Sequence, residues 1–163
     1  MLQIRKAELK DLEAITDIYN EAVRNTTATF DTQPKTAAQQ REWFDHHDAK
    51  HPVIVACEGD NTIGWASLSA YSDRCAYAAT AEASVYISPE WRGKGVGRKL
   101  SAEILKAGKE AGLHTVILRI AEGNDASIKL AESLGFKQIG VMEEVGTKFG
   151  KVLDVILMQL IYR

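Results

Sequence analysis

The spacing of apolar residues predicts two helices in the first third of the chain. From residue 12 onward, apolar side chains recur every three or four positions and would share one helix face. They are Leu12, Ile15, Ile18, Tyr19 and Ala22. Residues 36–47 are expected to form a second helix, with Trp43 and Phe44 on its apolar side. The threonine-rich stretch between the two helices, residues 25–34, is either a functional loop or a plain extended connection.

Apolar runs bounded by turn residues predict six strands. Residues 53–57 and 62–69 flank the turn sequence EGDN, so we expect them to form a hairpin. The remaining strands are expected at residues 3–5, 82–88, 115–120 and 152–162.

Two further helices are expected between the later strands, from residue 96 to about residue 112 and over residues 126–134. The elements therefore follow the order β-α-α-β-β-β-α-β-α-β. This mixed order predicts an α+β fold, with one mostly antiparallel sheet flanked by helices. No linker divides the chain, so residues 1–163 are expected to form a single domain.

Charge and composition exclude several classes of partner. The chain has 20 basic and 22 acidic residues and a net charge of -2, whereas nucleic-acid-binding domains are usually basic. No apolar run approaches the roughly 20 residues of a membrane span. From the charge we expect no nucleic-acid partner, and from the missing apolar run we expect no membrane partner. The two cysteines, Cys57 and Cys75, form no disulfide framework, and we therefore expect a cytoplasmic protein.

The stretch EWRGKGVGRK, residues 90–99, concentrates glycines and cations just before a predicted helix. Glycine lets a ligand approach the backbone closely, and the first amides of a helix are unpaired and carry partial positive charge. The stretch therefore favours a phosphate or pyrophosphate site, the alternative being a solvated basic turn. The GxxxxGK[ST] pattern is absent, and the spacing GxGxG differs from the dinucleotide fingerprint GxGxxG.

Several motifs resemble the GCN5-related N-acetyltransferases, the GNAT family. The spacing Arg92-x-x-Gly95-x-Gly97 is similar to the pyrophosphate loop of that family, and the later Asn124 and Leu134-Gly135-Phe136 match its next helix. Within the family, the chain looks most like phosphinothricin and methionine sulfoximine acetyltransferases. The residues behind this resemblance are Thr29-Phe30, Pro34, residues 82–89, Gly123-Asn124-Asp125, Lys148-Phe149-Gly150, Asp154 and Gln159.

The resemblance implies the GNAT fold, with a splayed strand pair at the site of the co-substrate acetyl-CoA. The backbone of Val85, Tyr86 and Ile87 would pair with the pantetheine arm, and Asn124 would contact the arm near its thiol end. The pyrophosphate would be held by the loop and helix start, which comprise Arg92, Gly93, Lys94, Gly95, Val96, Gly97 and Arg98. No metal is implied.

Amine acetylation requires a base, because an ammonium group has no lone pair. Glu82 opens the otherwise apolar strand EASVYI and is the candidate general base, a role that the family resemblance also implies. The alternative is a strand-end carboxylate that faces solvent. Direct attack on the thioester is favoured over a cysteine intermediate, because Cys57 lies in an apolar strand and Cys75 has no nearby histidine.

Two positions depart from the family pattern. Ala131 stands where many members have a tyrosine that acts as general acid, and Leu153 stands where phosphinothricin acetyltransferases often have a histidine. These departures leave the general acid unidentified. They also keep open the possibility of a CoA-binding module without turnover.

The expected acceptor is the α-amine of a small amino acid or an analogue of the phosphinothricin, methionine sulfoximine or methionine sulfone type. Arg74 could hold the carboxylate through two hydrogen bonds, or it could be an ordinary surface arginine. Phe30 could form a wall of the side-chain pocket or simply anchor its loop, and Tyr77 is a weaker candidate. The main alternative acceptor is a protein N-terminus or a peptide.

Two further features bear on partners. His46, His47 and His51 cluster in the sequence, but a solvated helix end explains them better than a metal site, because Pro52 follows and no further ligand is evident. The apolar tail VLDVILMQLIY offers more strand than one small sheet needs, and family members commonly pair. We therefore expect a homodimer.

Overall fold

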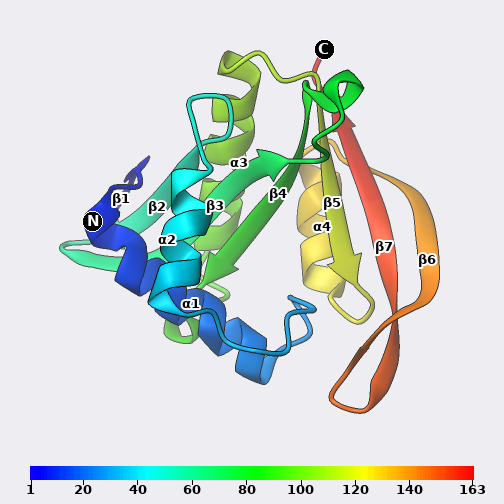
Figure 1. Ribbon diagram of the computed structural model, residues 1–163, viewed down its shortest axis with the longest axis horizontal. Coiled ribbons are helices and arrows are strands. Elements are labelled where there is room, and N and C mark those ends of the chain that lie inside the picture. The colour runs from blue at the N-terminus through cyan, green and yellow to red at the C-terminus, as the bar shows by residue number, and fades with distance from the viewer.

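A twisted seven-stranded sheet runs through the molecule in the computed structural model, which describes residues 1–163 (Figure 1). The strand order is β1-β2-β3-β4-β5-β7-β6, and every neighbouring pair is antiparallel except β4 and β5. The predicted mixed, mostly antiparallel sheet is therefore confirmed. The strands are β1 (Leu2–Lys6), β2 (Val53–Glu58), β3 (Asn61–Ala70), β4 (Thr80–Ile87), β5 (Thr115–Ala121), β6 (Lys137–Lys148) and β7 (Lys151–Ile161).

All four predicted helices are present, and three short 3₁₀ turns occur in the connections between other elements. The helices are α1 (Leu12–Asn25), α2 (Ala37–Asp45), α3 (Val96–Glu110) and α4 (Asp125–Ser133). The 3₁₀ turns are η1 (Leu9–Asp11), η2 (Cys75–Tyr77) and η3 (Pro89–Trp91). The second helix begins after Thr36, whose hydroxyl accepts the Gln39 N–H at 3.1 Å in a reciprocal capping box.

Helices cover both faces of the sheet, and each face has its own core (Figure 1). Helix α1 packs Ile15 and Ile18 against one face, next to Trp65. Helix α3 packs Leu100 and Ile104 against the other face, in a larger apolar cluster that also includes residues of α4, β5 and β7. Because successive strand residues point to opposite faces, a single strand contributes to both cores.

Strand β6 is the one regular strand that the hydrophobic pattern does not predict. It lies at the edge of the sheet, contains two glycines and two glutamates, and exposes most of its side chains. Its register with β7 shifts between Gln138 and Gly140 and again between Met142 and Gly146. Such bulges interrupt the alternation of apolar and polar residues, so no period of two is visible in the sequence.

Candidate active site

Strands β4 and β5 pair over three residues only and then separate. Their parallel register joins Thr80–Glu82 to Thr115–Ile117, whereas residues 83–87 of β4 have β3 on one side and no strand on the other. The backbone N–H and C=O groups that face this gap therefore have no ladder partners. This is the splayed strand pair that the family resemblance implies, and it lies in the middle of the sheet (Figure 1).

The glycine loop turns the chain from β4 into α3 beside this gap. Gly93 and Gly95 have φ angles of +74° and +84°, a backbone conformation that glycine adopts without strain. The first helical backbone bond runs from the Lys99 N–H to the Gly95 carbonyl at 3.2 Å, and no side chain caps the helix. The amides of Val96, Gly97 and Arg98 therefore remain available for an anion, as the sequence predicts.

The cations of this loop make specific contacts with the rest of the protein. The Arg92 guanidinium lies 2.6 Å from a Glu21 carboxylate oxygen and also donates to the Ile87 carbonyl at 3.1 Å. Arg98 donates to the Ser133 hydroxyl at 2.9 Å. Lys94 lies over the Trp91 ring, 5.0 Å from its centroid. Arg92 thus ties the loop to α1, a partner that could not be read from the local sequence.

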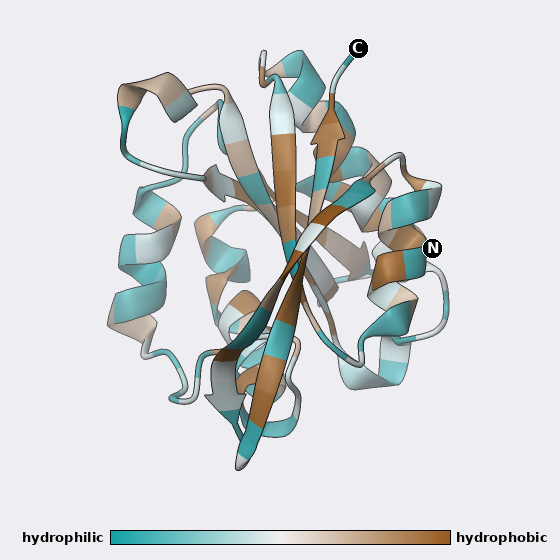
Figure 2. Cartoon of the chain, turned by 90° about the vertical axis from the view of Figure 1, so that its right-hand side faces the viewer, coloured by the Kyte–Doolittle hydropathy of each residue, from teal (hydrophilic) through white to brown (hydrophobic).

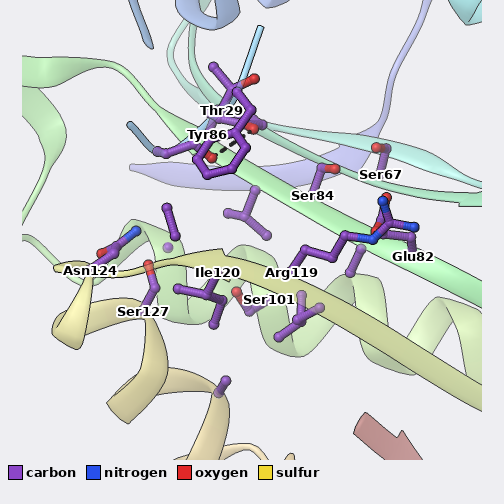
Figure 3. A pocket seen from close by; sticks show the side chains of 18 of the residues that line it. Thr29, Ser67, Glu82, Ser84, Tyr86, Ser101, Arg119, Ile120, Asn124 and Ser127 are labelled. Carbon is purple, nitrogen blue, oxygen red and sulfur yellow. Dashed lines mark hydrogen bonds and ion pairs between the residues drawn. The ribbon is translucent and has the colours of Figure 1, made fainter. Parts of the chain in front are cut away.

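A cavity of about 850 Å³ occupies the gap between β4 and β5 and extends under the threonine-rich loop (Figure 3). It brings together seven of the residues that the sequence predicts for the co-substrate, catalytic and substrate sites. They are Phe30, Glu82, Val85, Tyr86, Ile87, Gly97 and Asn124. Glu82 lies at one end of the view in Figure 3, and Asn124 lies at the opposite end beside Ser127.

Glu82 is paired with a residue that the sequence analysis missed. Its Oε2 lies 2.8 Å from Arg119 Nε of β5, and both side chains line the cavity (Figure 3). The contact is an ion pair without an aligned hydrogen bond, and the buried Oε2 has no hydrogen-bond donor. The only indication of Arg119 in the sequence was a single cation in the apolar strand TVILRIA. Its partner was hidden, because the β4–β5 pairing joins distant parts of the chain.

Aromatic hydroxyl groups form another wall of the cavity. Tyr19 packs edge-on against Tyr86, with ring centroids 5.1 Å apart, and donates a hydrogen bond to Asp31. Burial raises the pKa of Tyr86 to about 12. Burial, together with the bond to Asp31, also raises the pKa of Tyr19 well above its usual value. Each phenol proton is already engaged, that of Tyr19 by Asp31 and that of Tyr86 by the Ala28 carbonyl at 3.4 Å.

The threonine-rich loop is held against the β6–β7 hairpin by two contacts. Lys148, which is 3% exposed, donates from Nζ to the Thr29 carbonyl at 2.7 Å. The Phe30 ring occupies the space that a side chain at Gly146 would need. Burial lowers the pKa of Lys148, although the negative charge of Asp31 opposes this shift. These contacts fix Phe30 where it lines the cavity.

Two of the predicted substrate residues do not line the cavity. Arg74 precedes η2 in the connection from β3 to β4 and is exposed. Tyr77 is exposed and packs edge-on against Tyr71, with ring centroids 5.2 Å apart. Their closeness to Glu82 in the sequence does not bring them into the cavity, because the connection turns outward before β4 begins. Their assignment to substrate binding gains no support from this arrangement.

The other positions considered from the sequence are Ala131, Leu153, His47 and the two cysteines. Ala131 is buried and lines the cavity without a hydroxyl group, and Leu153 is buried in β7. His47 Nε2 lies 3.0 Å from Ser69 Oγ, and its Nδ1 faces the Trp43 carbonyl at 2.7 Å. Burial lowers the pKa of His47. Cys57 is buried and Cys75 is exposed.

No group of three or more histidine, cysteine, aspartate or glutamate side chains is arranged to hold a metal ion. None of the helices has both the length and the apolar character that crossing a membrane requires.

The family model described as "Acetyltransferase (GNAT) family" matches residues 13–136. An L-methionine sulfoximine/L-methionine sulfone acetyltransferase from Pseudomonas paraeruginosa is 39% identical over 159 residues, which cover 96% of this chain and 92% of that protein.

Two solved structures share the fold over nearly the whole chain. A GNAT superfamily phosphinothricin acetyltransferase from Sinorhizobium meliloti, in complex with AcCoA, has a TM-score of 0.94 and 36% identity, and the match covers 98% of this chain and 88% of the other. A ribosomal-protein-alanine N-acetyltransferase from Brucella melitensis has a TM-score of 0.95 and 36% identity, with 98% and 99% covered.

Proposed function

The chain belongs to the GNAT family of acetyltransferases and is an N-acetyltransferase, and from this premise we propose that it transfers the acetyl group of acetyl-CoA to the α-amine of a small amino acid or analogue. Phosphinothricin, methionine sulfoximine and methionine sulfone are the model acceptors. The observation that supports this most is the Glu82 carboxylate in the cavity, beside the gap between β4 and β5.

The residues around the gap fit acetyl-CoA. Around Val85 and Ile87 the edge of β4 has no strand partner, and only the Ile87 carbonyl is engaged, by Arg92, so the remaining groups can hydrogen-bond an extended amide chain as an added strand would. The free amides of Gly97 and Arg98 suit a pyrophosphate. Asn124 precedes α4, and its side chain makes no capping bond there, so the amide is free to contact the pantetheine arm. Acetyl-CoA would supply an activated acetyl thioester at this place.

Glu82 acts as the general base in this proposal. An amine attacks only after losing a proton from its ammonium form, and the carboxylate lies in the cavity where that proton must go. The Glu82 Oε2 atom is buried against Arg119 Nε without an aligned hydrogen bond, so the ammonium group of the acceptor can take the place of that nitrogen.

The leaving thiolate needs little help from the protein. Ala131 provides no proton donor, but a thiol with a pKa near ~8.5 is a fair leaving group without one. Solvent can then protonate the thiolate.

The proposal is tested by measuring acetyl-CoA-dependent thiol release over a panel of acceptors. The panel contains the free amino acids, phosphinothricin, methionine sulfoximine, methionine sulfone and several short peptides. Turnover on one or more small amino acids or analogues, with the N-acetyl product identified by mass, is the expected result. Acetyl-CoA binding without any turnover would instead support a CoA-binding module.

A protein N-terminus is the second candidate acceptor. The similarity to a ribosomal-protein-alanine N-acetyltransferase favours it, at an identity equal to that of the phosphinothricin acetyltransferase structure. Turnover on the peptides alone would support this second candidate and contradict the first.

We also propose that the protein forms a homodimer through the β6–β7 edge. Several large apolar side chains are exposed there, and Figure 2 faces this edge, where brown bands interrupt the teal ones. They are Ile139, Val141, Val145, Phe149 and Val152. Sedimentation of the protein and of a Val141→Glu variant tests this: the variant should be monomeric, and a monomeric wild type would overturn the proposal.

A further inference from the structure

Arg119 lines the cavity and is the one charged residue of β5. It stands near the middle of β5, between Leu118 and Ile120, beyond the three residues that pair with β4, so β7 lies on one side of the strand and the gap on the other. Its nearest partner is Glu82 at 2.8 Å, and both residues line the cavity (Figure 3).

The pairing uses only part of the Arg119 guanidinium. The Nε atom faces Glu82, and neither terminal nitrogen donates a hydrogen bond to the protein. The Arg119 side chain is 52% exposed and that of Glu82 is 32% exposed. A planar guanidinium with two free terminal nitrogens is the geometry that binds a carboxylate through two parallel hydrogen bonds.

The side chains around Arg119 include polar groups, but they provide no carboxylate other than that of Glu82 to pair with it. Ser67 and Ser84 project from β3 and β4 at the same end of the cavity (Figure 3). The carboxylate of Asp31 also lines the cavity, but it is engaged by Tyr19 and lies 3.6 Å from Lys35 Nζ. A bound anion would therefore complete the contacts of Arg119.

We propose that Arg119 is the receptor for an anionic group adjacent to the reacting amine of the acceptor, the α-carboxylate of an amino acid. This inference rests on the proposed function and gives Arg119, rather than Arg74, the carboxylate-binding role. The ammonium of the zwitterionic acceptor takes the place of Arg119 Nε at Glu82, and its carboxylate accepts hydrogen bonds from the two terminal nitrogens of Arg119.

This exchange conserves charge, which gives the site its selectivity. The Glu82–Arg119 pair and the zwitterionic acceptor each have no net charge. Binding of the acceptor replaces one opposite-charge contact with two. A simple amine without a carboxylate is a cation that must compete with Arg119 for Glu82. Arg119 therefore favours amino acids and opposes plain amines.

The test uses two acceptors that differ only in the carboxylate. One is the amino acid or analogue that reacts fastest in the panel, and the other is the same molecule without its α-carboxylate. In Arg119→Gln, kcat/KM should fall about 10- to 100-fold for the amino acid, mainly through KM, because a charge-assisted bidentate contact is lost. For the plain amine kcat/KM should stay constant or rise. Arg119→Lys keeps the charge but cannot make two parallel hydrogen bonds, so its kcat/KM for the amino acid should lie between those of wild type and Arg119→Gln.

Arg41→Gln is the matched control. Arg41 is 55% exposed and also paired with a carboxylate, Asp45, but it lies on α2 outside the cavity. This variant should match wild type on both acceptors. Rates are compared at the maximum of each variant's pH profile, so that a change in the ionisation of the site does not imitate a loss of binding.

Each outcome has a separate meaning. Equal losses of kcat/KM on both acceptors would show that Arg119 only positions Glu82. An unchanged kcat/KM on both would show that Arg119 neither binds the carboxylate nor positions Glu82. Either result overturns this inference but leaves the proposed acetyltransferase activity intact. If wild type itself acetylates no amino acid or analogue, the proposed function fails, and the inference fails with it.

Discussion

Two arginine–carboxylate pairs in this protein have different surroundings and different roles. In the pair that joins β1 to η1, Arg5 donates from both terminal nitrogens to Asp11, at 2.7 and 2.9 Å, and the Glu8 N–H donates to the same carboxylate at 2.8 Å. In the cavity pair, one oxygen of Glu82 faces one nitrogen of Arg119 without an aligned hydrogen bond.

The difference separates a structural pair from a reactive one. The Asp11 side chain is 5% exposed and its oxygens are saturated, so the pair has nothing left to bind. The pair of Glu82 and Arg119 has unused donors and acceptors and lies beside a cavity. Local saturation, rather than the residue types, therefore indicates which ion pair can exchange partners with a substrate.

The largest effect expected at the structural pair comes from Asp11→Asn. Removing one partner leaves the Arg5 charge beside a carboxamide, and we expect unfolding by denaturant to give a loss of about 2 to 3 kcal/mol. The kcat of the folded enzyme should not change, because Asp11 lies outside the cavity. A fall in kcat with unchanged stability would contradict the division between the two pairs.

The stability that Asp11 contributes should depend on pH. Burial alone would raise the pKa of Asp11, but hydrogen bonds from Arg5 and the Glu8 N–H outweigh burial and hold the pKa below its usual 3.8. The unfolded chain therefore takes up a proton at a higher pH than the folded protein does, so this contribution is complete above pH 3.8 and is lost as the pH falls through the folded value. The difference in unfolding free energy between wild type and Asp11→Asn should shrink below pH 3.8; a constant difference would argue against an ionised, paired Asp11.

A smaller effect is expected from Arg5→Lys. Lysine keeps the charge but cannot make the two parallel bonds, and we expect a loss of about 1 kcal/mol in the free energy of unfolding. Equal losses for Arg5→Lys and Asp11→Asn would mean that geometry, not charge, dominates this pair. Thermal unfolding of the two variants side by side separates these possibilities.

The sequence predicted the frame of the molecule well, because local patterns define most of it. Four helices and six strands follow from apolar spacing and turn residues. The exception, β6, is an exposed edge strand whose two bulges break the alternation on which such predictions depend. Its stability comes from pairing with β7, which is tertiary information.

The site was predicted where it depends on one segment and missed where it depends on two. Glu82 and the glycine loop were found, because strand, turn and helix N-terminus follow one another in the chain. Arg119 was missed because its relation to Glu82 depends on the β4–β5 register. Arg74 was preferred because it is near Glu82 in sequence, yet its loop turns outward.

The most direct test of the central claim is the turnover number of Glu82→Gln, measured by thiol release at saturating acetyl-CoA with Asp11→Asn as the control. If Glu82 is the general base, kcat should fall by about 10²- to 10⁴-fold, while acetyl-CoA binding and the free energy of unfolding stay close to wild type. The control should lose stability and keep its kcat. An unchanged kcat in Glu82→Gln would show that the cavity pair does not perform the chemistry, and it would contradict the distinction drawn between the two ion pairs.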